Sequence, residues 1–210
     1  MNQRPVLYSF RRCPFAIRAR MALHTSEIDF EHREILLKDK PPEMLAISPK
    51  ATVPVLITDN GEVLDESSNI VFWSLGIHDP DRWLGKDQSL IPEIKTLLER
   101  NDVAFKPFLD RYKYADRHPE KSPEAHRTAC LFYLEELEAK LTANQFLLGD
   151  YLTAGDIVVM PFIRQFAFVD KTWFDQTPYP RLKAWLEDRL LSPLFIKTMA
   201  KVPLWEFRQK

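Results

Sequence analysis

The order of strand and helix patterns constrains this chain most. In the first 80 residues, short apolar runs typical of strands alternate with stretches typical of helices. After Asp79-Pro80-Asp81 the patterning is helical only. This change predicts an α/β unit followed by an all-α unit. We place the first unit at residues 1–78, a linker at 79–87 and the helical unit at 88–210.

The patterns of the first unit predict the order β-α-β-α-β-β-α. Strands are expected at residues 6–9, 28–36, 53–57 and 63–64, and helices begin at Pro14, at the Pro41-Pro42 pair and at Glu66. Strands joined by helices are expected to pair in parallel. Asn60-Gly61 is a strong hairpin signal, so the last two strands are expected to pair antiparallel.

The helical unit is expected to contain five helices. A long amphipathic helix covers residues 90–112, and Pro107 inside it predicts a kink. A second helix covers residues 123–141. Thr153 is followed by Asp156 and an apolar run, which predicts a helix that begins with a capping box. Two shorter helices follow at residues 180–190 and 193–200.

Composition excludes several classes of protein. The 29 basic and 30 acidic residues leave a net charge of -1, unlike the clustered positive charge of nucleic-acid-binding domains. The longest apolar run, residues 157–163, is far shorter than the ~20 residues of a membrane helix. Two cysteines and five histidines without metal-ligand spacing support neither a disulfide scaffold nor a metal site. We expect a cytoplasmic protein with no nucleic-acid or membrane partner.

Cys13 is the candidate nucleophile. It follows the first strand and precedes Pro14, so it is expected at the N-cap of the first helix, where backbone donors favour an anion. Four arginines lie close in sequence: Arg11, Arg12, Arg18 and Arg20. Both effects are expected to lower the pKa of the thiol below its free value of ~8.5. The alternative is a small buried side chain without chemistry.

The second cysteine does not assist the first. A dithiol redox pair needs a cysteine three positions after Cys13, and Ala16 stands there. Cys13 is therefore expected to act as a monothiol, through mixed disulfides or direct attack on an electrophile. Cys130 falls on the apolar stripe of a helix, so we interpret it as structural.

Two further segments are candidates for ligand binding. A cis bond at Val53-Pro54 would bare backbone groups that can pair with an extended peptide, whereas a trans bond would make an ordinary strand start; the spacing leaves both open. Glu66-Ser67 opens a helix whose free N–H groups bind carboxylates, and Glu66 can accept from an ammonium group. The alternative there is an ordinary capping pair.

Four segments resemble the glutathione transferase superfamily over nearly the whole chain. They are Tyr8-Ser-Phe-Arg-Arg-Cys-Pro-Phe15, Thr52-Val-Pro-Val-Leu56, Asp65-Glu-Ser-Ser-Asn-Ile70 and Leu148-Gly-Asp-Tyr-Leu-Thr-Ala-Gly-Asp-Ile157. The Cys-Pro-Phe form is similar to the omega class and related bacterial cysteine-type members. The resemblance implies an α/β thioredoxin-like N-terminal domain (βαβαββα), an all-α C-terminal domain, a homodimer, and glutathione as cosubstrate.

The resemblance also implies roles for individual residues. Cys13 would be the catalytic thiol, Val53 would pair its backbone with the cysteinyl unit of glutathione beside a cis Pro54, and Glu66 and Ser67 would bind the γ-glutamyl end. Lys40 looks like the omega-class lysine that meets the glycyl carboxylate. Candidates for the electrophile site are Phe10, Arg11, Arg12, Phe105 and Phe108.

Three functions are consistent with these residues. The first is glutathione-dependent thiol transfer or reduction of mixed disulfides and small oxidants through Cys13. The second is conjugation of glutathione to an electrophile, with Ser9 or Tyr8 as the donor to the glutathione thiolate. The third is a binding or regulatory module that keeps the fold without catalysis.

Overall fold

The chain folds into two compact units. The computed structural model describes residues 4–206. One unit contains residues up to Asp81 together with those from Pro193 onward, and the other unit is Arg82–Ser192. This grouping differs from the predicted division at 79–87 because the last segment lies with the first unit. Residues 1–3 and 207–210, at the outer ends of the predicted domains, lie outside the described residues.

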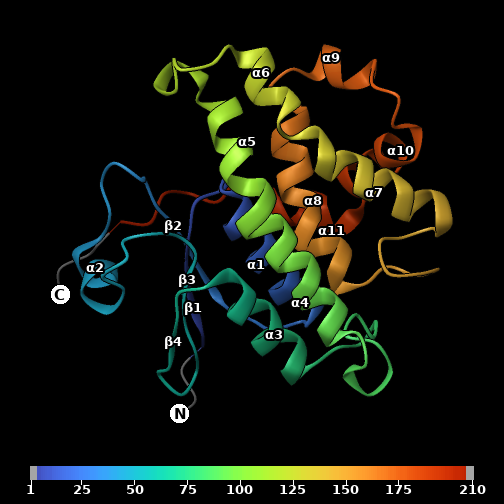
Figure 1. Cartoon of the computed structure of the whole chain (residues 1–210). Coiled ribbons are helices and arrows are strands. Elements are labelled where there is room, and N and C mark those ends of the chain that lie inside the picture. The colour runs from blue at the N-terminus through green and yellow to red at the C-terminus, as the bar shows by residue number, and fades with distance from the viewer. Residues whose placement is uncertain (1–3, 207–210) are drawn as a thin grey trace. The chain divides into compact units, whose positions relative to one another are not determined.

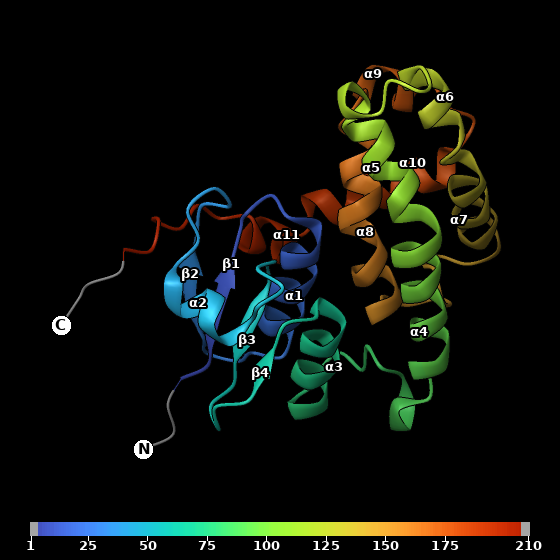
Figure 2. The ribbon, with the colours of Figure 1, turned by 60° about the vertical axis from the view of Figure 1, so that its left-hand side comes forward.

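The first unit has the predicted order of strands and helices (Figures 1 and 2). Its elements are β1 (Val6–Ser9), α1 (Pro14–Thr25), β2 (Glu31–Glu34), α2 (Pro42–Ile47), β3 (Val55–Ile57), β4 (Val63–Leu64), α3 (Ser67–Ile77) and α11 (Pro193–Thr198). The second and third strands are shorter than the predicted 28–36 and 53–57. The Asn60-Gly61 turn joins β3 to β4 as predicted, with Gly61 at a φ of 87°, a backbone conformation that glycine adopts readily.

The four strands form one sheet in the order β2-β1-β3-β4. β1 and β2 are parallel, as predicted, but β3 runs antiparallel to β1, with Tyr8 opposite Val55. The prediction that all helix-joined strands pair in parallel was therefore wrong for β3. The connecting helix α2 has only six residues, and the chain enters β3 at the end of the sheet where β1 finishes. The residues that follow β1 and those that precede β3 consequently meet at the same end of these two inner strands.

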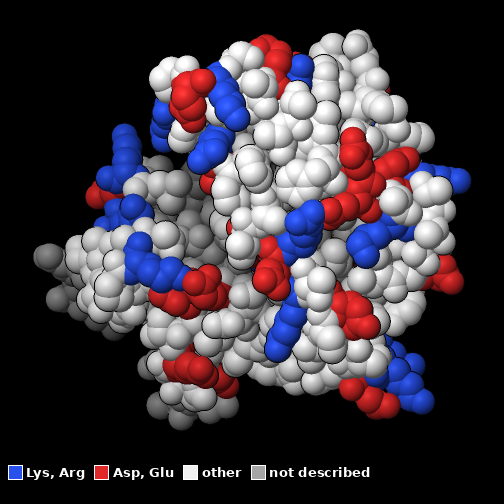
Figure 3. Space-filling view, viewed as in Figure 1, with Lys and Arg blue, Asp and Glu red and all other residues white. Residues whose placement is uncertain are grey.

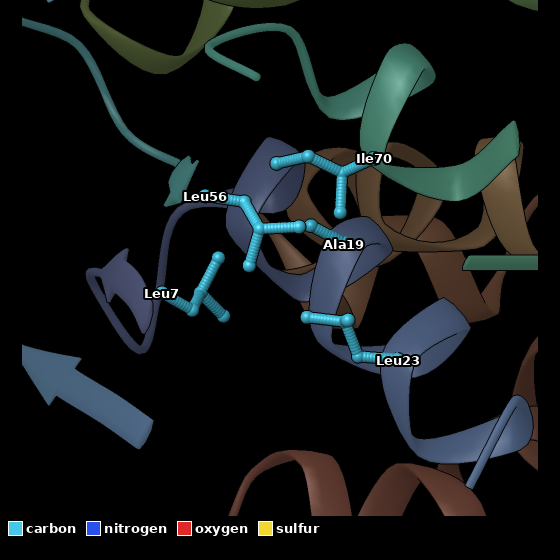
Figure 4. Packing of buried hydrophobic residues seen from close by; sticks show 5 residues of the cluster. All are labelled: Leu7, Ala19, Leu23, Leu56 and Ile70. Atoms are coloured by element: carbon cyan, nitrogen blue, oxygen red, sulfur yellow. The ribbon is translucent and has the colours of Figure 1, made fainter. Parts of the chain in front are cut away.

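Alternation along the strands separates two hydrophobic clusters. Leu7 and Leu56 point to the same side of the sheet, where they pack with residues of α1 and α3: Ala19, Leu23 and Ile70 (Figure 4). Tyr8 and Val55 point to the other side. There they pack with Met44 of α2, and Trp205 of the C-terminal segment contacts the same cluster.

All the named elements of the second unit are helices, joined by loops. Its elements are η1 (Lys86–Gln88), α4 (Ile91–Glu99), η2 (Arg100–Phe105), α5 (Lys106–Lys113), η3 (Ala115–Arg117), α6 (Pro123–Thr128), α7 (Leu131–Ala143), α8 (Ala154–Ala167), α9 (Lys171–Asp175) and α10 (Pro180–Leu191). Among residues 4–206, none of the helices combines the length and the apolar character needed to cross a membrane. Basic and acidic side chains are interspersed on the face seen in Figure 3.

Each of the two predicted helices, 90–112 and 123–141, is interrupted once. Before Pro107 the helix widens into the π-helical turn η2, because the proline has no N–H and its ring crowds the carbonyl of Val103. The predicted single helix over 123–141 is two helices, α6 and α7. Near the break, the hydroxyl of Thr128 donates to the carbonyl of Glu124, a contact that favours a bend.

Asp156 ties the start of α8 to two other segments. The predicted capping box is confirmed: the Asp156 carboxylate accepts from the Thr153 backbone N–H at 3.0 Å. Its other oxygen accepts from the backbone N–H of Leu147 at 3.1 Å and from the indole of Trp185 at 2.9 Å. Asp156 is fully buried, and burial raises the pKa of its carboxyl group. The network therefore depends on one buried acceptor.

We predict that Asp156→Ala lowers the free energy of unfolding by about 3 kcal/mol, because it leaves buried donors without an acceptor. Urea denaturation measures this. The control is Asp188→Ala on the exposed face of α10, which is expected to change the value by less than about 0.5 kcal/mol. Equal unfolding midpoints for the two variants would contradict the role of Asp156.

Candidate functional site

Cys13 lies at the N-cap of α1, as predicted, with Pro14 in the first turn. Its backbone is extended, with φ -70° and ψ 123°, and its side chain does not cap its own helix. The loop before it is closed by the Cys13 N–H, which donates to the carbonyl of Phe10 at 3.0 Å. The half-buried thiol points instead to the carbonyl of Val53, with Sγ 3.5 Å from that oxygen. The thiol is thus close to the segment before β3.

The Val53–Pro54 peptide bond is cis. This decides between the two conformations that the spacing left open. Val53 precedes the first residue pair of the β1–β3 ladder, which joins Tyr8 to Val55. The backbone of Val53 therefore lies beyond the paired part of the sheet and beside Cys13. An extended peptide placed here could form strand-like hydrogen bonds with the backbone of Val53.

Glu66 and Ser67 lie at the start of α3, as predicted, but neither forms an ordinary cap. Glu66 occupies the N-cap, and its side chain makes no capping hydrogen bond. It is exposed and forms an ion pair with Lys50. Ser67 is buried and its hydroxyl accepts from the guanidinium of Arg18 at 3.3 Å. Since Arg18 belongs to α1, the same helix that begins at Cys13 also holds Ser67.

Lys50 is a residue that the sequence did not point to. It contacts both Glu66 and, at 3.5 Å, the carbonyl of Asp65. Lys40, the lysine implied by the resemblance, lies in the loop before α2. A single exposed lysine 16 positions before Glu66 carries no pattern of its own, so only the fold reveals this pair.

The electrophile-site candidates fall into two groups. Phe10, Arg11 and Arg12 form the loop before Cys13, and Phe10 packs against the same cluster as the thiol. Phe105 belongs to the helical unit and is 0% exposed, with its ring 4.6 Å from that of Tyr133. It is a core residue in this structure and is not accessible to a ligand. The neighbouring Phe108 is half-buried and packs edge-to-face on Phe132.

Tyr8 and Ser9, the alternative donors, are buried. The hydroxyl of Tyr8 accepts from Arg33 at 2.6 Å, and that of Ser9 accepts from Arg20 at 2.5 Å. Burial raises the pKa of Tyr8, although the charge of Arg33 acts in the opposite direction. Both hydroxyls are thus engaged inside the unit, whereas Cys13 is partly accessible.

Cys130 has the structural role that its position on an apolar stripe predicts. Its side chain is fully buried, and Sγ lies 3.6 Å from the carbonyl of His126. Burial raises the pKa of the thiol to about 12. Cys130 is therefore a neutral thiol at physiological pH.

We predict that iodoacetamide at pH 8 modifies Cys13 and leaves Cys130 unmodified, since only Cys13 is accessible and the Cys130 thiol stays protonated up to about pH 12. Peptide mass spectrometry after timed quenching measures both rates. In urea both cysteines are expected to react, which is the control for detection. Comparable rates in the folded protein would contradict the distinction between the two thiols.

Comparisons with known proteins agree with the fold. Residues 7–81 match the family model described as "Glutathione S-transferase, N-terminal domain", and residues 124–188 match the model of the corresponding C-terminal domain. Glutathione S-transferase U22 of Arabidopsis thaliana is 30% identical over 81% of this chain and 78% of its own length. A probable maleylacetoacetate isomerase of Caenorhabditis elegans is 25% identical over 93% of this chain and 92% of its own length.

A solved structure has the same fold. Glutathione transferase URE2P6 of Phanerochaete chrysosporium, crystallised with oxidized glutathione, superposes with a TM-score of 0.81. The alignment covers 93% of this chain and 94% of that chain, at 22% sequence identity.

Proposed function

The chain belongs to the glutathione S-transferase family, and we propose that it is a glutathione-dependent enzyme of the cysteine type. Its nucleophile is Cys13, which transfers thiols and reduces mixed disulfides or small oxidants. The observation that carries the proposal is the position of the Cys13 sulfur, 3.5 Å from the carbonyl of Val53 at a cis-proline. The sulfur of a peptide paired with Val53 would lie close to this thiol.

The groups around Cys13 complement glutathione, an extended tripeptide with two carboxylates and one ammonium group. The backbone of Val53 pairs with the cysteinyl unit by strand-like hydrogen bonds. The γ-glutamyl carboxylate lies at the N-terminus of α3, beside the hydroxyl of Ser67 that Arg18 holds. Glu66 accepts from the ammonium group. Lys40 remains the proposed contact of the glycyl carboxylate.

Lys50 changes its partner when glutathione binds. Its ammonium group forms an ion pair with Glu66. When the ammonium group of glutathione takes that carboxylate, Lys50 is released toward the nearby γ-glutamyl carboxylate. Because both side chains are about half exposed, the exchange costs little free energy.

The reaction is a two-step thiol–disulfide exchange. The Cys13 thiolate attacks the glutathione sulfur of a mixed disulfide, the S–S bond breaks, and the released thiolate takes a proton from water. A second glutathione thiolate then attacks the glutathione sulfur on Cys13, forming oxidised glutathione and restoring the Cys13 thiolate. A second glutathione is needed because Ala16 stands where a resolving cysteine would be.

The two competing functions have less support. Conjugation requires a hydrogen-bond donor that reaches the glutathione thiolate, and the candidate hydroxyls of Tyr8 and Ser9 are buried inside the unit. A non-catalytic module would have no use for a partly accessible thiol beside Val53. A protein that conjugates chloronitrobenzene but does not reduce hydroxyethyl disulfide would favour conjugation.

We predict that Cys13→Ala lowers hydroxyethyl disulfide reduction more than about a hundredfold, because the nucleophile is lost. Glutathione is still expected to bind, as calorimetry would show. Cys130→Ala is the matched control and should retain activity. An alanine variant at position 13 with full activity would overturn the thiol-transfer proposal, and a wild type that binds no glutathione at millimolar concentration would favour the module.

We predict that Glu66→Gln weakens glutathione binding about tenfold, because the carboxylate that meets the ammonium group is lost. Calorimetric titration gives the Kd. Glu62→Gln on the exposed β3–β4 turn is the control and is expected to leave the Kd unchanged. The same Kd for both variants would remove Glu66 from the proposed site.

A further inference from the structure

The backbone of Arg11, two residues before Cys13, is held at both ends by buried charged side chains. Its N–H donates to a carboxylate oxygen of Glu34 at 2.6 Å, and its carbonyl accepts from the guanidinium of Arg20 at 2.8 Å. Arg20 is 0% exposed and Glu34 is 7% exposed. Hydrogen bonds that involve charged groups are roughly twice as strong as those between neutral groups. Glu34 and Arg20 thus hold the backbone of Arg11 from two sides, and we refer to these two residues as the clamp.

Arg20 directs its other nitrogens to the same loop and to the end of the chain. Nη1 donates to the hydroxyl of Ser9 at 2.5 Å and to the carbonyl of Phe10 at 3.5 Å. Nε donates to the carbonyl of Thr198 at 3.1 Å. Burial lowers the pKa of Arg20 to about 10, and the negative charges of Glu34 and of a deprotonated Cys13 act to raise it. Arg20 is therefore cationic at neutral pH.

Glu34 is fixed in the same way by its own strand and by the C-terminal segment. Its second carboxylate oxygen lies 3.1 Å from Nε2 of His32. Its backbone carbonyl accepts from the N–H of Trp205 at 2.8 Å, and Glu34 forms a parallel bridge with Leu204. The C-terminal segment therefore supports both members of the clamp.

We propose that Arg20 and Glu34 are positioning residues for Cys13: by holding the Arg11 peptide from both sides, they fix the loop that sets the thiol against the carbonyl of Val53. The catalytic part of this inference rests on the proposed role of Cys13. The effect of the clamp on the loop is measured by alkylation of Cys13, which needs no glutathione.

The charge of Arg20 has a second effect on Cys13. Since a deprotonated Cys13 raises the pKa of Arg20, the cation equally favours the thiolate over the thiol. The charged groups near the loop are Arg11 and Arg12 in the loop itself, Arg20 from α1, and Glu34 with His32 from β2. Removing the cation is therefore expected to shift thiolate formation to higher pH.

Two kinds of variant separate geometry from charge. Arg20→Lys keeps the cation but has one nitrogen, so it cannot hold Arg11, Ser9 and Thr198 together. Arg20→Met removes both the positive charge and the guanidinium N–H donors. Glu34→Gln retains an oxygen that can accept from the Arg11 N–H, whereas Glu34→Ala does not. All variants carry Cys130→Ala, so that Cys13 is the reacting thiol.

The experiment measures alkylation of Cys13 by iodoacetamide from pH 5 to 10, together with kcat, KM for glutathione and the melting temperature. Arg20→Met is expected to shift the midpoint of the alkylation profile upward. Arg20→Lys and Glu34→Ala are expected to lower the plateau rate and kcat about tenfold with KM within about twofold. Glu34→Gln is expected to rescue most of the loss. If Arg20→Met does not fold, the proposal is tested by Arg20→Lys and by the two variants Glu34→Gln and Glu34→Ala.

The control is Arg4→Met with Asp29→Ala, an exposed arginine–carboxylate pair of the same unit, which should leave every rate unchanged. A purely structural role predicts lower melting temperatures with unchanged midpoint, plateau and kcat for the folded variants, and that result would overturn the proposal. The proposed function fails separately: if Cys13→Ala keeps full activity while Arg20→Lys slows alkylation, the clamp stands and the thiol-transfer mechanism does not.

Discussion

The candidate site depends on the antiparallel pairing of β1 with β3. In this register Tyr8 lies opposite Val55, so the end of β1 and the start of β3 lie side by side. Cys13 and Val53 are 40 positions apart in sequence, yet this pairing places the thiol 3.5 Å from the Val53 carbonyl. A β3 parallel to β1 would begin beside the start of β1, and the thiol would then lie far from the cis-proline segment.

Helix α1 connects the other parts of the site. Its N-cap carries the thiol, and its two buried arginines hold different elements: Arg18 reaches Ser67 at the start of α3, and Arg20 reaches the loop before Cys13 and the end of α11. Burying a cation is unfavourable unless its donors are satisfied. Both arginines make charged hydrogen bonds inside the unit, so α1 acts as a rigid base for the thiol and for the proposed γ-glutamyl contact.

Local patterns predicted the local features of the site and of the fold. Pro14 after a strand identified Cys13 as an N-cap residue, and the Thr153–Asp156 spacing identified the capping box of α8. Features set by contacts distant in sequence could not be predicted in this way. The direction of β3, the Lys50–Glu66 pair and the return of Trp205 to β2 each join segments that no short motif relates. Phe105 was misjudged because an aromatic residue of a helix core and one of a binding pocket have the same helical spacing.

The proposed reaction requires Cys13 to exchange disulfides with glutathione as a monothiol. The most direct measurement is mass spectrometry of the intact protein and its peptides after incubation with oxidised glutathione. This reaction predicts one glutathione adduct, located on Cys13 and removed by an excess of reduced glutathione. An adduct on Cys130, or a Cys13 that stays unmodified while the protein binds glutathione, would contradict it.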